Sequence, residues 1–247
     1  MDLELAGKTA IVGGASAGIG LGIARAFHRE GANLVMFSNE KEDLERCANE
    51  LNAAWVVGDQ RDDADVARLV ETAVSSFGTV DILVLNGGGP GHGPAASVRD
   101  DELVEGASLV LLSAVRLVRH CLPYLAKGGY GRILAILSTS VFEPIDDLVL
   151  SNVYRPAVLG FLKTLSREVG GSGVTVNAIA PGRISTRTFE EFYEHRSREA
   201  DLAEIPVGRF GGPEEVGDLA AFLASGRAAY VTGTIIPIDG GLTRSLT

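Results

Sequence analysis

The sequence predicts an α/β fold: one doubly wound, parallel, seven-stranded sheet with helices on both faces. Short β-like apolar runs alternate with helical patterns along the whole chain, several runs are apolar throughout, and a glycine-rich turn follows the first of them. Uninterrupted apolar strands are typical of parallel sheets that helices cover on both faces. With 247 residues and no long linker or repeat, the chain is expected to form a single domain, residues 1–247.

The strands are expected in the runs with high β propensity. These runs are 9–13, 33–37, 54–58, 81–86, 132–137, 174–179 and 234–238. Two of the helices between them matter for function, residues 101–125 and residues 151–169. The first is apolar on more than one side, so it is either deep core or half of a subunit contact. Ligands of such sheets bind beyond the carboxyl ends of the strands.

Composition narrows the class of partner. The net charge of −10 argues against nucleic acid and anionic membranes, because both require an excess of basic residues. The N-terminus "MDLELAGKTAIVGG" has acids where a signal peptide needs bases, and its apolar run is too short to span a bilayer. The two cysteines, Cys47 and Cys121, are expected to be spectator thiols in a reducing compartment. We therefore expect a cytoplasmic protein that binds a small molecule.

The first strand leads directly into "GGASAGIG", Gly13 to Gly20, and then into a helix. Glycines in this context let the backbone approach a pyrophosphate at the helix N-terminus, where free N–H groups and the helix dipole favour negative charge. The alternative is a tight turn without a ligand. The strand before the turn and the helix after it favour dinucleotide binding.

Several segments together resemble one family. The spacing of Gly14, Gly18 and Gly20, the segments "DILVLNGGG" and "VNAIAPGRISTRT", and the tail "PVGRFGGPEEVGDLAAFLAS" are similar to the short-chain dehydrogenase/reductase family over nearly the entire chain. The resemblance is to its 3-oxoacyl-(acyl-carrier-protein) reductase-like branch. It implies a Rossmann-type fold and an NAD or NADP cofactor, with Asp59 bonded to the adenine and Thr186 near the nicotinamide amide.

The resemblance also implies a set of cofactor-binding residues on the loops after the strands and on the catalytic helix. They are Gly14, Ser16, Gly18, Ile19, Gly20, Ser38, Asn39, Asp59, Asn86, Gly88, Arg155, Pro181, Gly182, Ile184 and Thr186.

The catalytic residues depart from the family pattern of Asn, Ser, Tyr and Lys. Aligning "GFLKTLSREV" with the family's Gly-Phe-x-Lys-x-Leu segment places Ser151 at the Tyr position and Arg155 at the Lys position. Ser138 lies thirteen residues before Ser151, the family's Ser-to-Tyr interval, and Val110 takes the place of the Asn. The tetrad is therefore incomplete, and Ser138 is the one member kept in kind.

A serine hydroxyl cannot replace the phenol as a proton donor, because it does not titrate in the accessible range. Arg155 is a permanent cation one turn from Ser151, suited to anchoring ribose hydroxyls. Two other groups are candidate donors. Tyr154 either turns its phenol to the pocket or packs against a neighbouring helix, and His92 in "GGGPGHGP" either faces the substrate or faces solvent. Asn152 is expected to be no more than a helix cap.

Cofactor choice is decided at the end of the second strand, in "FSNEK". An acid there selects NAD through the ribose hydroxyls, and a nearby base selects NADP through the 2′-phosphate. Ser38 and Asn39 are neutral and suit either cofactor, whereas Lys41 could reach a phosphate. The segment favours NADP over NAD.

Three functions fit these features. The first is an NAD(P)-dependent oxidoreductase for a small carbonyl or alcohol, with a non-standard active site. The second is a redox-inactive, cofactor-binding sensor or partner subunit, and the third is a lyase or isomerase on the same fold. The resemblance implies a homotetramer or homodimer built on the helices 101–125 and 151–169. No metal-ligand spacing is present.

Overall fold

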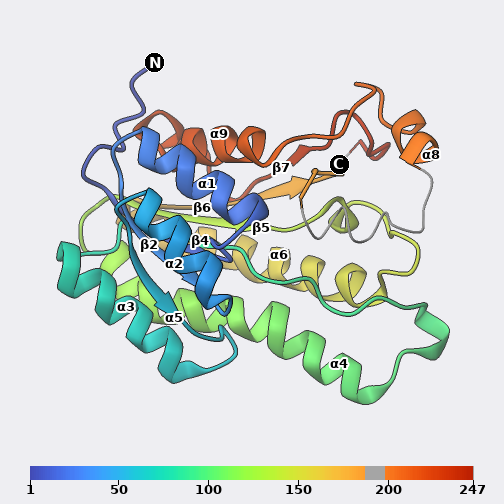
Figure 1. Cartoon of the computed structure of the whole chain (residues 1–247), viewed down its shortest axis with the longest axis horizontal. Helices are drawn as coiled ribbons and strands as arrows, with labels where there is room; N and C mark the ends of the chain where they lie inside the picture. Colours follow the sequence, from blue (N-terminus) through green and yellow to red (C-terminus); the bar gives the residue numbers. More distant parts are fainter. Residues whose placement is uncertain (187–197, 247) are drawn as a thin grey trace.

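The computed structural model describes residues 1–186 and 198–246. Its centre is a parallel sheet in the order β3-β2-β1-β4-β5-β6-β7 (Figure 1). The strands are β1 Thr9–Gly13, β2 Asn33–Ser38, β3 Ala54–Val57, β4 Ile82–Leu85, β5 Gly131–Ile136, β6 Val174–Pro181 and β7 Ile235–Ile238. All seven predicted strands are confirmed, and the largest difference in a boundary is at Pro181, two residues beyond the predicted end.

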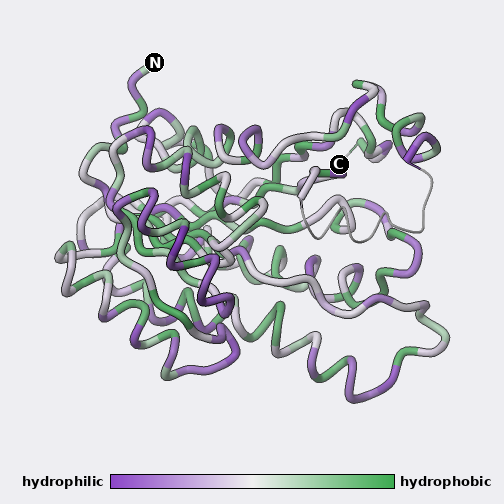
Figure 2. Tube along the Cα trace, viewed as in Figure 1, coloured by the Kyte–Doolittle hydropathy of each residue, from purple (hydrophilic) through white to green (hydrophobic). Residues whose placement is uncertain are grey.

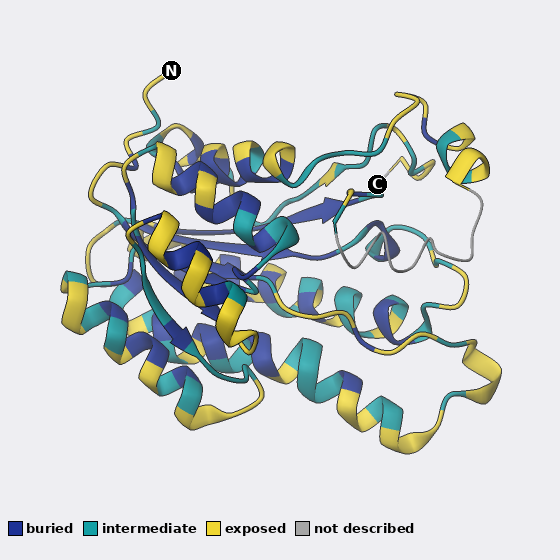
Figure 3. Ribbon diagram, viewed as in Figure 1, coloured by how far each residue is buried: buried dark blue, intermediate teal, exposed yellow. Residues whose placement is uncertain are grey.

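Helices cover both faces of the sheet (Figures 1 and 3). One face carries α1 Gly18–Arg29, α2 Lys41–Glu50 and α9 Pro213–Ala224. The other carries α3 Asp63–Phe77, α5 Ser113–Leu125 and α6 Val149–Val169. Two short helices, α4 Asp100–Gly106 and α8 Arg198–Ala203, lie at the carboxyl ends of the strands.

Alternating strand residues explain why the sheet is apolar throughout. In β1, Ala10 and Val12 belong to the core under α1 and α9, whereas Ile11 belongs to the core under α3 and α5. Successive side chains of a strand point to opposite faces, so a strand covered on both sides needs an apolar residue at every position. Figure 2 shows the resulting hydrophobic interior, with polar residues on the outer sides of the helices.

The predicted helix 101–125 is one continuous helical segment with a π-helical stretch, Ala107–Leu112, between α4 and α5. By length and composition alone, Asp100–Leu125 could cross a membrane. Its α5 part, however, buries Leu117, Val118 and Cys121 in the core. The α5 part of the segment is therefore a core helix of the domain. π-helical stretches occur often at functional sites, and this one lies beside the cavities described below.

The strand order reverses direction between β1 and β4, which are hydrogen-bonded neighbours. A crevice forms at such a switch point because the connections from the two strands leave in opposite directions. Asn86, directly after β4, donates through its side-chain amide to the Gly13 carbonyl at 2.9 Å. This bond fixes the glycine-rich turn against the neighbouring strand end and places the crevice between them.

Candidate functional site

The turn from β1 to α1 is built for close backbone approach. Gly14 and Gly18 have φ of 58° and 53°, in the left-handed region that favours glycine. A Cβ at Gly20 would lie 2.2 Å from the Gly14 carbonyl oxygen. The N-cap of α1, Ala17, provides no side-chain hydrogen bond. The first N–H groups of α1 therefore remain available to a bound anion, at the positive end of the helix dipole.

This turn opens into a cavity of about 300 Å³, which also reaches the ends of β2 and β4. Most of the predicted cofactor residues line it. They are Gly14, Ser16, Gly18, Ile19, Gly20, Ser38, Asn39, Asn86, Gly88 and Thr186. Ser38 is buried, and its hydroxyl lies 2.9 Å from that of Ser16 and accepts from the Glu40 N–H at 3.2 Å. These bonds tie the end of β2 to the glycine-rich turn.

A second cavity of about 290 Å³ continues from Ser38 and Asn39 toward the end of β3. Asp59, for which the resemblance implies a bond to the adenine, lines it together with Arg61. The Arg61 guanidinium donates two hydrogen bonds to Asp59 Oδ2, at 2.6 and 2.9 Å, and lowers the pKa of the carboxyl group. Asp59 is therefore ionised at neutral pH and can accept hydrogen bonds.

Four predicted cofactor residues are not among those that line these cavities. One is Arg155, which lines the small cavity described below. Pro181 ends β6, and Gly182 packs so closely on Asp239 that a Cβ would meet it at 2.6 Å. Ile184 is buried and lines a separate cavity of about 130 Å³ near Arg209.

The predicted catalytic helix brings Ser151 and Arg155 together, one turn apart. Arg155 Nε donates to Ser151 Oγ at 3.0 Å, and Nη1 donates to the carbonyls of Leu137 at 2.9 Å and Ile136 at 3.2 Å. Burial lowers the pKa of Arg155 to about 10. The group is still a cation at neutral pH. It anchors α6 to the end of β5 and does not release protons under working conditions.

The serine that approaches Ser151 is Ser140, whose Oγ lies 3.2 Å from Ser151 Oγ. Ser138, which the sequence pairs with Ser151 by its interval of thirteen residues, lies just before Ser140. The Ser138 hydroxyl accepts from the Ser140 N–H at 3.1 Å and begins a short 3₁₀ turn, Thr139–Val141. That turn brings the buried Ser140 against α6. Because the Ser138 hydroxyl is the acceptor in this bond, the bond does not use the hydroxyl proton.

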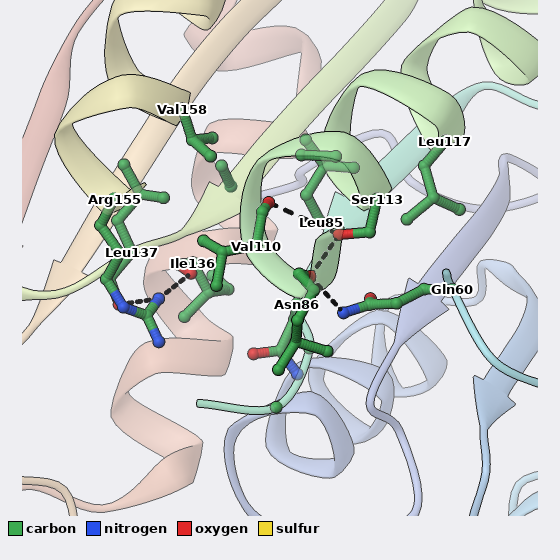
Figure 4. Close-up of a pocket in the computed structure, with 15 residues that line it drawn as sticks. Gln60, Leu85, Asn86, Val110, Ser113, Leu117, Ile136, Leu137, Arg155 and Val158 are labelled. Atoms are coloured by element: carbon green, nitrogen blue, oxygen red, sulfur yellow. Dashed lines mark hydrogen bonds between the residues drawn. The ribbon is translucent and has the colours of Figure 1, made fainter. Parts of the chain in front are cut away.

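A cavity of about 40 Å³ lies beside Arg155, between β4, β5 and the π-helical stretch (Figure 4). Leu85 and Val110 both line it, and Val110 is the residue that the resemblance aligns with the family's Asn. Gln60 crosses its edge and donates to the Leu109 carbonyl at 3.0 Å, and the Ser113 hydroxyl donates to the same carbonyl. The π-helical carbonyl is therefore satisfied by side chains.

Tyr154 does not turn toward the cavities. Its hydroxyl donates to the Leu103 carbonyl of α4 at 2.7 Å, and its ring covers Gly106, where a Cβ would lie 2.9 Å from a ring carbon. Of the two alternatives for this residue, packing against a neighbouring helix is the one observed. The geometry removes Tyr154 as a proton donor, because its proton is bonded within the fold.

His92 lines the cavity expected to hold substrate. This cavity, of about 510 Å³, lies between the glycine-rich loop after β4, α4 and the start of α6. Arg99, Glu102 and Glu105 give it a charged rim, and Arg99 is ion-paired to Glu102 at 3.1 Å. Leu109 lines this cavity and both the adenine and the small cavity, so the three meet at one point.

Sequence reasoning missed Gln60, Arg61 and Ser140. Gln60 and Arg61 directly follow Asp59, so their place at the end of β3 was a usable signal. Ser140 had none, because its direction depends on the 3₁₀ turn. Lys41, the candidate for a 2′-phosphate, is exposed and is not among the residues that line the two cofactor cavities. Within the described ranges, no group of His, Cys, Asp and Glu could hold a metal ion.

Comparison with known proteins identifies the family of the chain. Residues 14–243 match the family model described as enoyl-(acyl carrier protein) reductase. The oxidoreductase UcpA of Escherichia coli is 36% identical over 97% of this chain and 96% of its own. The 3-oxoacyl-(acyl-carrier-protein) reductase FabG of Pseudomonas aeruginosa is 36% identical over 98% of this chain and 100% of its own.

Among solved structures, the L-sorbose reductase of Gluconobacter frateurii, in complex with NADPH and L-sorbose, superimposes with a TM-score of 0.94. It is 32% identical, and the match covers 100% of both chains. These matches cover nearly the whole chain, and they agree with the glycine-rich turn and the order of the strands. The chain belongs to the short-chain dehydrogenase/reductase family of NAD(P)-dependent oxidoreductases.

Proposed function

We propose that the protein is an NADP(H)-dependent oxidoreductase that interconverts a small carbonyl compound and its alcohol. The observation that carries the proposal is the uncapped N-terminus of α1, set behind a glycine cradle that opens into the cofactor cavity. The substrate cavity shares Leu109 with the cavity at the end of β3 and with the small cavity beside Arg155. Its family membership and an NADPH-bound relative support the same reading.

The residues present fit a dinucleotide. A pyrophosphate matches the free N–H groups of α1 and the helix dipole, next to a turn in which Gly20 packs directly on the Gly14 backbone. Asp59 and Asn39 would hold the adenosine half, and Arg155 would hold the ribose at the nicotinamide end. The bound cofactor supplies or accepts the hydride. The protein fixes its orientation and keeps a cation beside it.

The reduction also needs a proton donor for the carbonyl oxygen. His92 lines that cavity, and histidine is the side chain that exchanges protons near neutral pH. We assign it as the donor to the carbonyl oxygen. A water held by the Ser138 hydroxyl is the alternative source, since that hydroxyl retains its proton. Arg155 serves as an anchor in either case.

The cofactor preference is tested by calorimetric titration with both dinucleotides. We expect NADPH to bind at least about tenfold more tightly than NADH, a difference of about 1.4 kcal/mol. The Lys41→Ala variant should keep this preference, because Lys41 lies outside the cavity. Tighter binding of NADH would contradict the NADP assignment and point to Glu40, the one carboxylate that lines the 300 Å³ cavity, as a ribose acceptor. Absence of binding would overturn the function.

A redox-inactive, cofactor-binding protein is the second candidate. It is favoured by the hydroxyls of Ser151 and Tyr154, both of which are bonded within the fold rather than directed at substrate. In this case the cofactor would be a bound ligand without turnover. The two functions predict the same binding and differ in cofactor consumption.

Assembly and location follow from the same surfaces. We place an interface between copies of this chain on the α4 to α6 side, where Val104, Leu112 and Val153 are exposed apolar residues. Val104 is the most exposed of the three, with 71% of its surface accessible to solvent. A dimer or tetramer would cover them. Cys47 and Cys121 are free and buried, which suits the reducing cytoplasm.

A further inference from the structure

Two loops lie at the substrate cavity, and a residue outside that cavity holds them together. The first loop, residues 87–94, follows β4 and lines the cavity with His92. The second, residues 142–148, leads into α6, whose first residues Val149 and Leu150 line the cavity. Asn152 lies in the first turn of α6 and is not among the residues that line the cavity. Its expected role as a helix cap is wrong, because the N-cap is Leu148.

The Asn152 side chain forms a paired contact with the backbone of Ile145. Its Nδ2 donates to the Ile145 carbonyl at 2.9 Å, and its Oδ1 accepts from the Ile145 N–H at 3.1 Å. A carboxamide can donate and accept at once in this way, whereas a carboxylate only accepts. Asn152 therefore holds both backbone groups of one residue in the second loop.

The contact continues from Ile145 to the first loop. The Leu148 N–H donates to the Ile145 carbonyl at 3.3 Å, which closes a turn. The far end of that turn pairs with Gly93 as an isolated parallel bridge: the Gly93 N–H donates to the Asp147 carbonyl at 2.7 Å, and the Val149 N–H donates to the Gly93 carbonyl at 3.3 Å. Gly93 follows His92 directly.

Neither loop is held in place by its own backbone preferences. Asp147 has φ of 59°, a left-handed conformation that non-glycine residues rarely adopt. Gly88, Gly89 and Gly91 have no atoms within 4 Å of a Cβ position, so the first loop is loosely surrounded there. Glycine-rich segments lose more conformational freedom than others when they are ordered. An external fastening is therefore needed to hold this arrangement.

We propose that Asn152 is a positioning residue for the substrate site: by pairing with Ile145 it fixes the bridge between Gly93 and Leu148, and thereby the place of His92 at the cavity. The assignment of the cavity as a substrate site rests on the function proposed above. The contact of Asn152 with Ile145, and its effect on the two loops, do not.

The experiment measures backbone amide hydrogen exchange in the full-length protein. In Asn152→Ala, exchange at the Gly93 and Val149 amides should rise roughly 10- to 100-fold, as expected for loss of two hydrogen bonds. Asn152→Asp keeps an acceptor for the Ile145 N–H but sets a carboxylate oxygen against the Ile145 carbonyl, so exchange at the same amides should rise in this near-isosteric variant too. Asp146→Ala is the matched control, since Asp146 is exposed in the same loop.

Activity supplies a second readout. Asn152→Ala should raise the KM for the carbonyl substrate about tenfold and shift the pH dependence of kcat, while the dissociation constant for NADPH stays within about twofold. Unchanged exchange at Gly93, or an equal rise in the Asp146→Ala control, would overturn the proposal. If the wild-type protein shows no turnover, only the proposed function is contradicted. The exchange measurement still tests whether Asn152 holds the two loops.

Discussion

Replacing Gly20 with alanine is expected to weaken dinucleotide binding roughly 10- to 100-fold, the equivalent of about 1–3 kcal/mol. The added Cβ would lie 2.2 Å from the Gly14 carbonyl oxygen and 2.8 Å from the Asn86 side-chain amide. Both contacts are with atoms of the glycine-rich turn or of Asn86, which is bonded to it. The turn must therefore shift, and its N–H groups would no longer converge on the pyrophosphate. Calorimetric titration with NADPH measures the loss.

Two variants control this result. Gly160→Ala places a methyl group on α6 where nothing lies within 4 Å, so it should bind NADPH as the wild type does. Gly22→Ala strains the contact of α1 with α9, because its Cβ would meet the Pro213 carbonyl at 2.5 Å. A loss of affinity in Gly22→Ala as large as in Gly20→Ala would show that general destabilisation, rather than the cradle, causes the effect.

Replacing Arg155 with methionine should affect both stability and cofactor binding. It leaves the carbonyls of Ile136 and Leu137 without their donor, which costs about 1–3 kcal/mol of unfolding free energy for each buried group left unsatisfied. It also removes the cation beside the nicotinamide end, so the dissociation constant for NADPH should rise roughly tenfold or more. Denaturant unfolding and calorimetric titration measure the two effects separately.

Arg167→Met is the matched control, because Arg167 lies on the same helix and is exposed. It should leave stability and binding nearly unchanged. The Arg155→Lys variant keeps the charge but cannot reproduce the planar set of bonds to a hydroxyl and two carbonyls, so we expect an intermediate affinity. Unchanged binding in Arg155→Met would remove Arg155 from the cofactor site and leave it a purely structural role.

The strands were predictable because each needs apolar residues on both faces. β1 illustrates this, since Ala10, Ile11 and Val12 serve two separate cores and form an unbroken apolar run. The cofactor cavity was predictable for a related reason: glycine at positions 14, 18 and 20 is required by the backbone itself, through positive φ or close approach. In β1 and in the glycine-rich turn, burial on both faces and backbone geometry restrict which residue types can occur.

The catalytic end was less predictable because side-chain direction there depends on distant elements. The interval between Ser138 and Ser151 matched the family, but it did not show that Ser138 begins a 3₁₀ turn or that Ser140 contacts Ser151. Tyr154 is directed by the Leu103 carbonyl, 51 residues away in the chain. Asn152 bonds to a loop whose path no local pattern encodes. Each of these outcomes is decided by tertiary packing.

The measurement that tests the central claim most directly is cofactor consumption by the wild-type protein. NADPH is supplied with a panel of small ketones and sugars, and NADPH oxidised and alcohol formed are both quantified. We predict that at least one substrate is reduced, with one NADPH consumed for each alcohol produced, despite Ser151 and Arg155 at the positions where the resemblance implies Tyr and Lys. Tight binding of NADPH with no consumption across the panel would contradict the oxidoreductase function and favour the redox-inactive alternative.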